Sequence, residues 1–129
     1  MLKVSSRTIV VVDQRLLECS FKKDKFDASE FINKYKNLIV LRSLSNFYSI
    51  ESLKISYVIT NSELSKVIQE KNMVNQIDKL SERLAITAVK DKKYQSETRN
   101  KIKTENEYVS KTLNDSNVKY TESDTHLIL

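Results

Sequence analysis

The chain has 129 residues, 40% of them hydrophobic and 30% charged, with a formal net charge of +5. This composition suits one globular domain of ordinary size. The chain contains no glycine and no proline. P-loops, dinucleotide-binding fingerprints and nucleophile elbows are therefore excluded, because their sharp turns and close approach to phosphate require glycine.

The cellular location follows from what the chain lacks. Its longest aliphatic runs, at 9–12 and 38–41, are far shorter than the roughly twenty residues needed to cross a bilayer. In the opening stretch MLKVSSRTIVVVD, the apolar run before Asp13 is too short for the hydrophobic region of a secretory signal peptide. A single cysteine, Cys19, cannot form an intramolecular disulfide. We therefore expect a cytoplasmic protein that does not associate with membranes.

The first sixty residues carry most of the apolar side chains and should form the core. The runs 8–12 and 16–21 predict two strands, with DQR between them closing a hairpin. Asp27 and Glu30 form a capping box that starts a helix running to about Asn37. The runs 38–41 and 53–59 predict two further strands.

A second helix start lies at Thr60 and Glu63, and no strong helix breaker follows before Leu113. The fold class predicted is α+β, with residues 1–60 forming a small antiparallel sheet under one short covering helix. Residues 61–116 are predicted to form a long helical segment that is first amphipathic and then polar. This segment is expected to bend near residues 69–72, and a coiled coil or a helical hairpin would fit it. Residues 117–129 form a tail or an edge strand.

An apolar stripe runs along this helical segment when each residue is advanced by about 100°. The stripe is predicted to bind a partner protein or a second copy of the chain, and its members are Met73, Ile77, Leu80, Leu84, Ala88, Ile102 and Val109. Residues 73–88 could equally complete the chain's own core. An isolated helix of this polarity is marginal in water, which favours a partner.

Basic residues cluster in the same segment and suggest an alternative role in binding nucleic acid. The candidate contacts are Lys90, Lys92, Lys93, Arg99, Lys101 and Lys103. They point in nearly every direction around the helix, however, whereas binding to phosphates needs cations on one face. A solvated lysine-rich surface is therefore the favoured interpretation.

Few residues suggest chemistry. Glu122, Asp124 and His126 alternate and could accept a divalent metal if the tail is extended, but polar termini are more often simple tails. Cys19 alternates with Leu17 and Phe21, which is typical of a core position. We therefore predict no catalytic residue, no metal and no cofactor.

The predicted function is a non-enzymatic protein–protein interaction module. A small adaptor, inhibitor or assembly subunit acting through its C-terminal helix fits this description, with homo-oligomers as one form of assembly. A phage or mobile-element origin would suit the skewed composition. A nucleic-acid-binding regulator is the second hypothesis, and a metal-dependent enzyme is the third.

Overall fold

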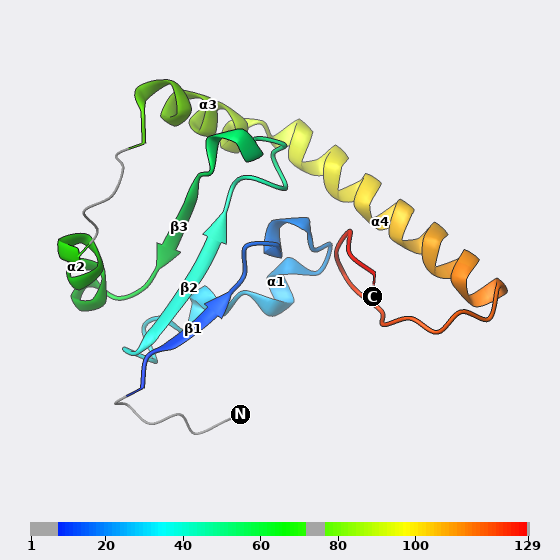
Figure 1. Ribbon diagram of the computed structural model, residues 1–129, viewed down its shortest axis with the longest axis horizontal. Helices are drawn as coiled ribbons and strands as arrows, with labels where there is room; N and C mark the ends of the chain where they lie inside the picture. Colours follow the sequence, from blue (N-terminus) through cyan, green and yellow to red (C-terminus); the bar gives the residue numbers. More distant parts are fainter. Residues whose placement is uncertain (1–7, 72–76, 129) are drawn as a thin grey trace.

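A computed structural model describes residues 8–71 and 77–128. Three strands form one sheet in the order β1 (Val10–Asp13), β2 (Leu38–Ser43) and β3 (Ser56–Ile59) (Figure 1). β1 pairs with β2 in parallel, and β2 pairs with β3 antiparallel. The α+β class is confirmed in general terms, but the all-antiparallel sheet is wrong at β1.

The predicted hairpin fails because the chain does not reverse after β1. The run 16–21 forms a 3-10 turn at Leu17–Cys19 instead of a strand. The chain then passes back to the opposite end of the sheet before β2 starts. There the Val10 amide donates to the Asn37 carbonyl at 2.9 Å, which fixes the parallel register.

The predicted covering helix is shorter than expected. The chain forms α1 (Lys23–Phe26) and then a 3-10 turn at Ala28–Phe31. Asp27 does cap this turn, accepting a hydrogen bond from the Ser29 amide at 2.8 Å. The helix cannot continue to Asn37 because Ile32 turns into the core and β2 begins six residues later.

Two apolar clusters hold the chain together. One joins Ile32, Leu38 and Val40 beneath the sheet. The other is built on Cys19, Phe47 and Tyr48 and is also contacted by partly buried residues of the C-terminal helices, namely Ala88, Tyr94 and Ile102. The second cluster therefore fastens those helices to the loop that follows β2.

The long C-terminal helix is divided into α2 (Ser62–Lys71), α3 (Lys79–Lys90) and α4 (Lys92–Asp115). Asn61, and not Thr60, caps α2 through the amides of Glu63 and Leu64. The end of α2 agrees with the predicted break near 69–72, although residues 72–76 lie outside the described part. Asp78 and Asp91 cap α3 and α4, and these caps stop a single continuous helix because the carboxylates take the first free amides.

The tail returns to the body of the protein (Figure 1). The Phe21 amide donates to the Asp124 carbonyl at 3.0 Å, and Lys22 pairs with the Asp124 carboxylate at 2.6 Å. Asn106 of α4 donates to the carbonyls of Ser123 and Thr125. Between 117 and 128 the chain forms no strand, so the expected edge strand is absent there.

Among the described residues, no helix combines the length and the apolar character needed to span a membrane.

The Cys19 thiol should be unreactive in the folded protein. Its side chain is buried, and burial, followed by the nearby Glu18 charge, raises the pKa of the thiol to about 11. Because the thiolate is the reactive form, we expect a disulfide reagent at pH 8 to label Cys19 slowly until guanidinium unfolds the chain. Equal labelling rates with and without denaturant would contradict this burial.

Candidate functional site

A cavity opens where the two parallel strands end. β1 ends at Asp13 and β2 at Ser43, and ligands of open α/β sheets bind just beyond the carboxyl ends of parallel strands. The cavity has a volume of about 700 Å³, which suits a small organic ligand. It is lined by Asp13, Arg15, Leu16, Ser43, Ser45, Asn46, Glu51, Lys54 and Ser56.

Asp13 provides a fixed negative charge in this cavity. The Arg15 guanidinium grips it in a fork, with Nε donating to both carboxylate oxygens at 3.0 Å and Nη2 to one at 2.7 Å. The side-chain hydrogen bond from Arg15 lowers the pKa of Asp13, so the carboxylate is charged at neutral pH. The Arg15 backbone amide also donates to Oδ1 of Asp13 at 3.0 Å. A carboxylate has about four acceptor positions, so an N–H of a ligand would replace one of the four Arg15 contacts.

Hydroxyl groups and one ammonium also line the cavity. The Ser43 hydroxyl donates to the Ile55 carbonyl at 3.3 Å and accepts from the Ser45 amide at 3.1 Å. Lys54 precedes Ile55 and is the only lysine among the lining residues. Its φ of 50° is left-handed, a conformation that costs a non-glycine residue roughly 1–3 kcal/mol and is found at functional sites.

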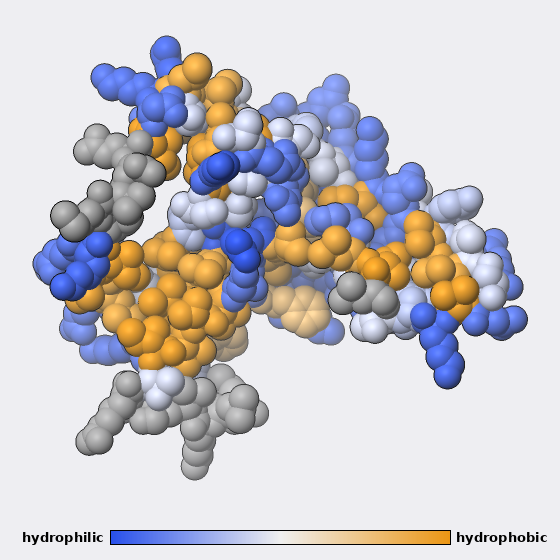
Figure 2. Space-filling model, viewed as in Figure 1, coloured by the Kyte–Doolittle hydropathy of each residue, from blue (hydrophilic) through white to orange (hydrophobic). Residues whose placement is uncertain are grey.

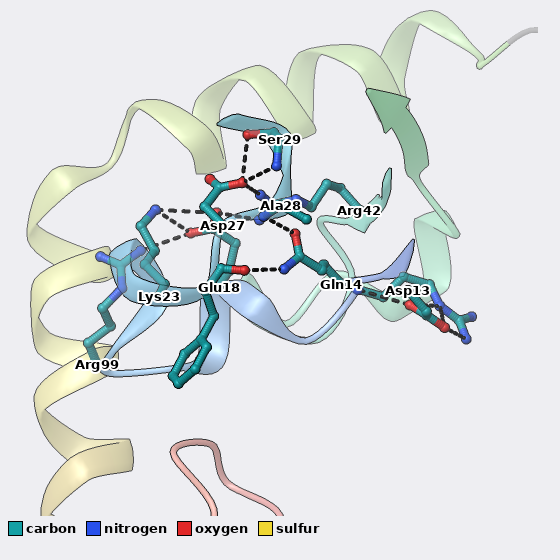
Figure 3. A network of polar contacts seen from close by, with 11 residues as sticks. Asp13, Gln14, Glu18, Lys23, Asp27, Ala28, Ser29, Arg42 and Arg99 are labelled. Carbon is teal, nitrogen blue, oxygen red and sulfur yellow. Dashed lines mark hydrogen bonds and ion pairs between the residues drawn. The ribbon is translucent and has the colours of Figure 1, made fainter. Parts of the chain in front are cut away.

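A polar cluster joins the segment after β1 to neighbouring elements (Figure 3). Arg42 of β2 is 4% exposed and contacts Asp27 at 2.6 Å and Glu18 at 3.9 Å. Glu18 also pairs with Lys23 at 3.1 Å and with Arg99 of α4 at 2.8 Å. The cluster therefore ties the segment after β1 to both β2 and α4.

Hydrogen bonds of Gln14 and Asp27 add to this cluster. Gln14 points toward the opposite segment in Figure 3, where its amide donates to the Phe26 carbonyl and accepts from the Ala28 amide. Burial alone would raise the pKa of Asp27, but hydrogen bonds from Ser29 and Arg42 outweigh it, and the net effect lowers that pKa. Both contacts hold the chain next to Asp13 in place.

The predicted apolar stripe is divided by the fold. Ala88 and Ile102 pack against the Phe47 cluster. The remaining described members are exposed, namely Ile77, Leu80, Leu84 and Val109, and Met73 lies outside the described residues. Partner binding through these exposed members stays a prediction.

The basic candidates also separate into two groups. The five lysines of the set, Lys90, Lys92, Lys93, Lys101 and Lys103, are exposed. Arg99 is partly buried, with its guanidinium 5.0 Å from the centre of the Phe47 ring and paired with Glu18. Arg99 therefore has a structural role in holding α4.

The metal hypothesis for the tail gains no support. Across residues 8–71 and 77–128, no three His, Cys, Asp or Glu side chains come together as a metal site. Asp124 is instead paired with Lys22.

Sequence reasoning missed Asp13, Ser43, Ser45 and Lys54 as site residues. DQR was interpreted as a hairpin turn, so Asp13 was not placed at the end of a parallel strand. The available signal was the position of this acid directly after the aliphatic run IVVV. Only the parallel pairing, which the local pattern does not show, brings Asp13 and Ser43 to the same edge of the sheet, with Asp13 paired to Leu41.

Apolar side chains also gather on the surface over the sheet and beside α2 (Figure 2). Ile9, Val11, Val58 and Val67 are among the exposed large hydrophobic residues of the chain. Val58 of this surface lines a second, smaller pocket together with Arg15 and Ser56, which also line the main cavity.

Comparison with known proteins identifies the relatives of this chain. The family described as aminotransferase class I and II matches residues 2–129. The histidinol-phosphate aminotransferase of Methanococcus aeolicus is 29% identical over 96 residues, which cover 74% of this chain and 25% of that protein. That of Caldicellulosiruptor saccharolyticus is 28% identical over 120 residues, which cover 93% of this chain and 34% of that protein.

Solved structures agree on the fold. The histidinol-phosphate aminotransferase of Sinorhizobium meliloti, in complex with pyridoxal-5'-phosphate, matches with a TM-score of 0.84 and 20% identity, over 97% of this chain and 34% of that one. The enzyme of Clostridium acetobutylicum matches with a TM-score of 0.74 and 25% identity, over 81% of this chain and 31% of that one. The chain thus spans about a quarter to a third of the relatives it matches.

These matches overturn the function expected from the sequence. A non-enzymatic adaptor, inhibitor or assembly subunit, a coiled coil and a phage protein all disagree with a match to a family of enzymes. The nucleic-acid-binding regulator and the metal-dependent enzyme are equally wrong as main functions. The error arose because α4 was interpreted as an unsupported arm, whereas it packs on the core beside the cavity. The match over residues 2–129 shows that the chain belongs to the class I and II aminotransferase family.

Proposed function

We propose that this chain provides the cofactor pocket for a transfer of amino groups that depends on pyridoxal phosphate. The proposed donor is an amino alcohol that carries a phosphate ester, such as histidinol phosphate. The observation that carries the proposal is the cavity at the ends of β1 and β2. Its lining combines the carboxylates of Asp13 and Glu51 with serine hydroxyls and the Lys54 ammonium. The names of the matched relatives support the substrate, and the S. meliloti complex supports the cofactor.

The residues in the cavity fit two of the three functional groups of the cofactor. The Asp13 carboxylate suits the protonated nitrogen of the pyridine ring, for which enzymes of this kind use a charged partner. Ser45 and Lys54 suit the phosphate, because hydroxyl and ammonium groups are its usual donors. The Ser43 hydroxyl donates its proton to the Ile55 carbonyl and holds Ser45 through the Ser45 amide. This assignment replaces the expectation of a chain without a cofactor.

Each residue would contribute to orientation or charge. Asp13 would hold a proton on the ring nitrogen, and Arg15 keeps the Asp13 carboxylate ionised. The Ser45 hydroxyl and Lys54 would fix the phosphate. The bound cofactor would supply an electron sink for the carbanion that forms at the amino-bearing carbon. Because the chain spans a quarter to a third of its relatives, the proposal assigns it this pocket and not a complete substrate site.

Titration of the purified chain with pyridoxal phosphate, followed by absorbance, tests the pocket. We expect saturable binding that Asp13→Asn weakens about tenfold or more, because a charge-assisted hydrogen bond to the ring nitrogen is lost. Asp24→Asn, which removes an exposed carboxylate in α1 outside the cavity, should leave binding unchanged. Equal affinity of the wild type and Asp13→Asn would contradict the assignment.

A second assay tests the role of the pocket in the transfer. Because the chain is assigned the pocket and not a complete substrate site, the readout is competition: pyridoxamine 5'-phosphate, the amino form of the cofactor, should displace bound pyridoxal phosphate. Failure to displace it would contradict a pocket that serves both the aldehyde and the amino form.

A further inference from the structure

The third functional group of the cofactor, its aldehyde, has no fitting partner in the cavity. Enzymes that use pyridoxal phosphate commonly attach the aldehyde carbon to a lysine as an imine. The lining contains one lysine, Lys54, and its other nitrogen-bearing side chains are the Arg15 guanidinium and the Asn46 amide. Neither of these nitrogens is a nucleophile at neutral pH, so Lys54 alone could react with the aldehyde.

The backbone of Lys54 lies next to the serine segment that suits the phosphate. Lys54 directly precedes Ile55, whose carbonyl accepts hydrogen bonds from the Leu44 amide and the Ser43 hydroxyl. Lys54 and Ser45 therefore come from neighbouring segments, and both line the cavity.

The ring nitrogen would lie at the opposite end of the cavity. Asp13 pairs with Leu41, two residues before Ser43, which puts about 7 Å of strand between the two ends. This separation compares with the length of a pyridine ring that carries a phosphomethyl arm. Arg15 cannot replace Lys54 at the phosphate, because its guanidinium is bound to Asp13 at the nitrogen end.

We propose that Lys54 is the counter-ion of the cofactor's phosphate and that this pocket holds pyridoxal phosphate without an imine bond to the chain. The inference rests on the proposed cofactor. It adds only how that cofactor is held, namely by its phosphate and without an imine bond to the chain. One ammonium meets a dianionic phosphate, and no second amine is available in the lining for the aldehyde.

Pyridoxamine 5'-phosphate provides the first test, because it has the same phosphate and ring but no aldehyde. If no imine forms, it should bind the wild-type chain within about threefold of pyridoxal phosphate. Binding of pyridoxal phosphate more than tenfold tighter would overturn the inference, since only the imine could account for the difference. Failure of both compounds to bind would instead contradict the proposed cofactor itself.

Two substitutions of Lys54 separate its two possible roles. Lys54→Arg keeps the positive charge but cannot form an imine, and it should bind pyridoxal phosphate within about threefold of the wild type. Lys54→Asn removes the charge while tolerating the left-handed backbone, and it should bind about tenfold or more weakly. Equal loss in both variants would overturn the counter-ion role.

Borohydride reduction followed by peptide mass mapping gives a direct readout. Reduction at equimolar cofactor should leave Lys54 unmodified, and a pyridoxyl adduct on Lys54 would overturn the proposal. Asn46→Lys is the matched positive control, because residue 46 follows the phosphate-side hydroxyls along the same segment and lines the cavity. A new adduct confined to residue 46 would show that an amine, when present, is detected there.

Discussion

Replacement of Arg42 by alanine should lower the free energy of unfolding by about 3–5 kcal/mol, the usual cost of removing one partner of a buried ion pair. The Arg42 side chain is 5% exposed, and its partners Asp27 and Glu18 are 31% and 17% exposed. Without the guanidinium, two poorly solvated carboxylates face each other across the loop that follows β1. Urea unfolding followed by circular dichroism measures the loss.

Arg15→Ala is the matched control for this prediction. It also removes a guanidinium from a carboxylate, but the Arg15 and Asp13 side chains are 58% and 49% exposed. Exposed pairs contribute about 1 kcal/mol or less because water screens them. Similar losses in the two variants would contradict the view that burial determines the cost.

The same ion pair gives the stability a defined pH dependence. The pKa of Asp27 is lowered in the folded state, so the stabilisation is present above its ordinary value and is lost as the pH falls through the folded value. We therefore expect stability to fall below about pH 4 in the wild type. Arg42→Ala should show a shallower fall, because the hydrogen bond that lowers this pKa has been removed.

Replacement of Phe47 by alanine should also lower the free energy of unfolding by about 3–5 kcal/mol, the usual cost of truncating a buried aromatic residue. Phe47 is 3% exposed, with its ring edge-on to those of Tyr48 at 5.0 Å and Tyr94 at 6.3 Å. The Tyr94 hydroxyl also donates to the Phe47 carbonyl at 3.2 Å. The substitution therefore leaves a cavity at the point where α4 docks.

Hydrogen exchange distinguishes this docking role from a general loss of stability. Amides of α4 should exchange faster in Phe47→Ala than amides of β2, which belongs to the other apolar cluster. Phe31→Ala serves as the control, because Phe31 is 44% exposed and should cost much less. Unchanged protection of α4 in Phe47→Ala would contradict the docking role.

Local signals in the sequence predicted part of the local structure. The strands near 10–13, 38–43 and 56–59, the cap at Asp27 and the end of α2 near residue 71 follow from alternation and capping residues, whereas the strand at 16–21 and the helix to Asn37 were wrong. The start of α3 and the break between α3 and α4 did not follow from such signals. Asp78 and Asp91 look like ordinary surface residues in a helical pattern, and only their side-chain hydrogen bonds reveal them as caps.

The site could not be predicted because it depends on strand direction. An aliphatic run followed by Asp13 fits either a hairpin or the end of a parallel strand, and the choice decides whether Asp13 and Ser43 lie at the same edge of the sheet. The glycines that usually reveal a phosphate site are also absent. Lys54 instead adopts the left-handed backbone, which no propensity scale favours for lysine.

The segment after β1 contacts Arg99 and Asp124, which lie much later in the chain, and these contacts determine when the pocket can form during folding. Glu18 and Arg99 are separated by 81 positions in the chain, and the Phe21 to Asp124 hydrogen bond spans an even longer loop. Contacts between such distant residues slow folding, because a large loop must close before they form. On the ribosome, the contacts that hold the segment after Asp13 are therefore completed only after residue 124 has emerged.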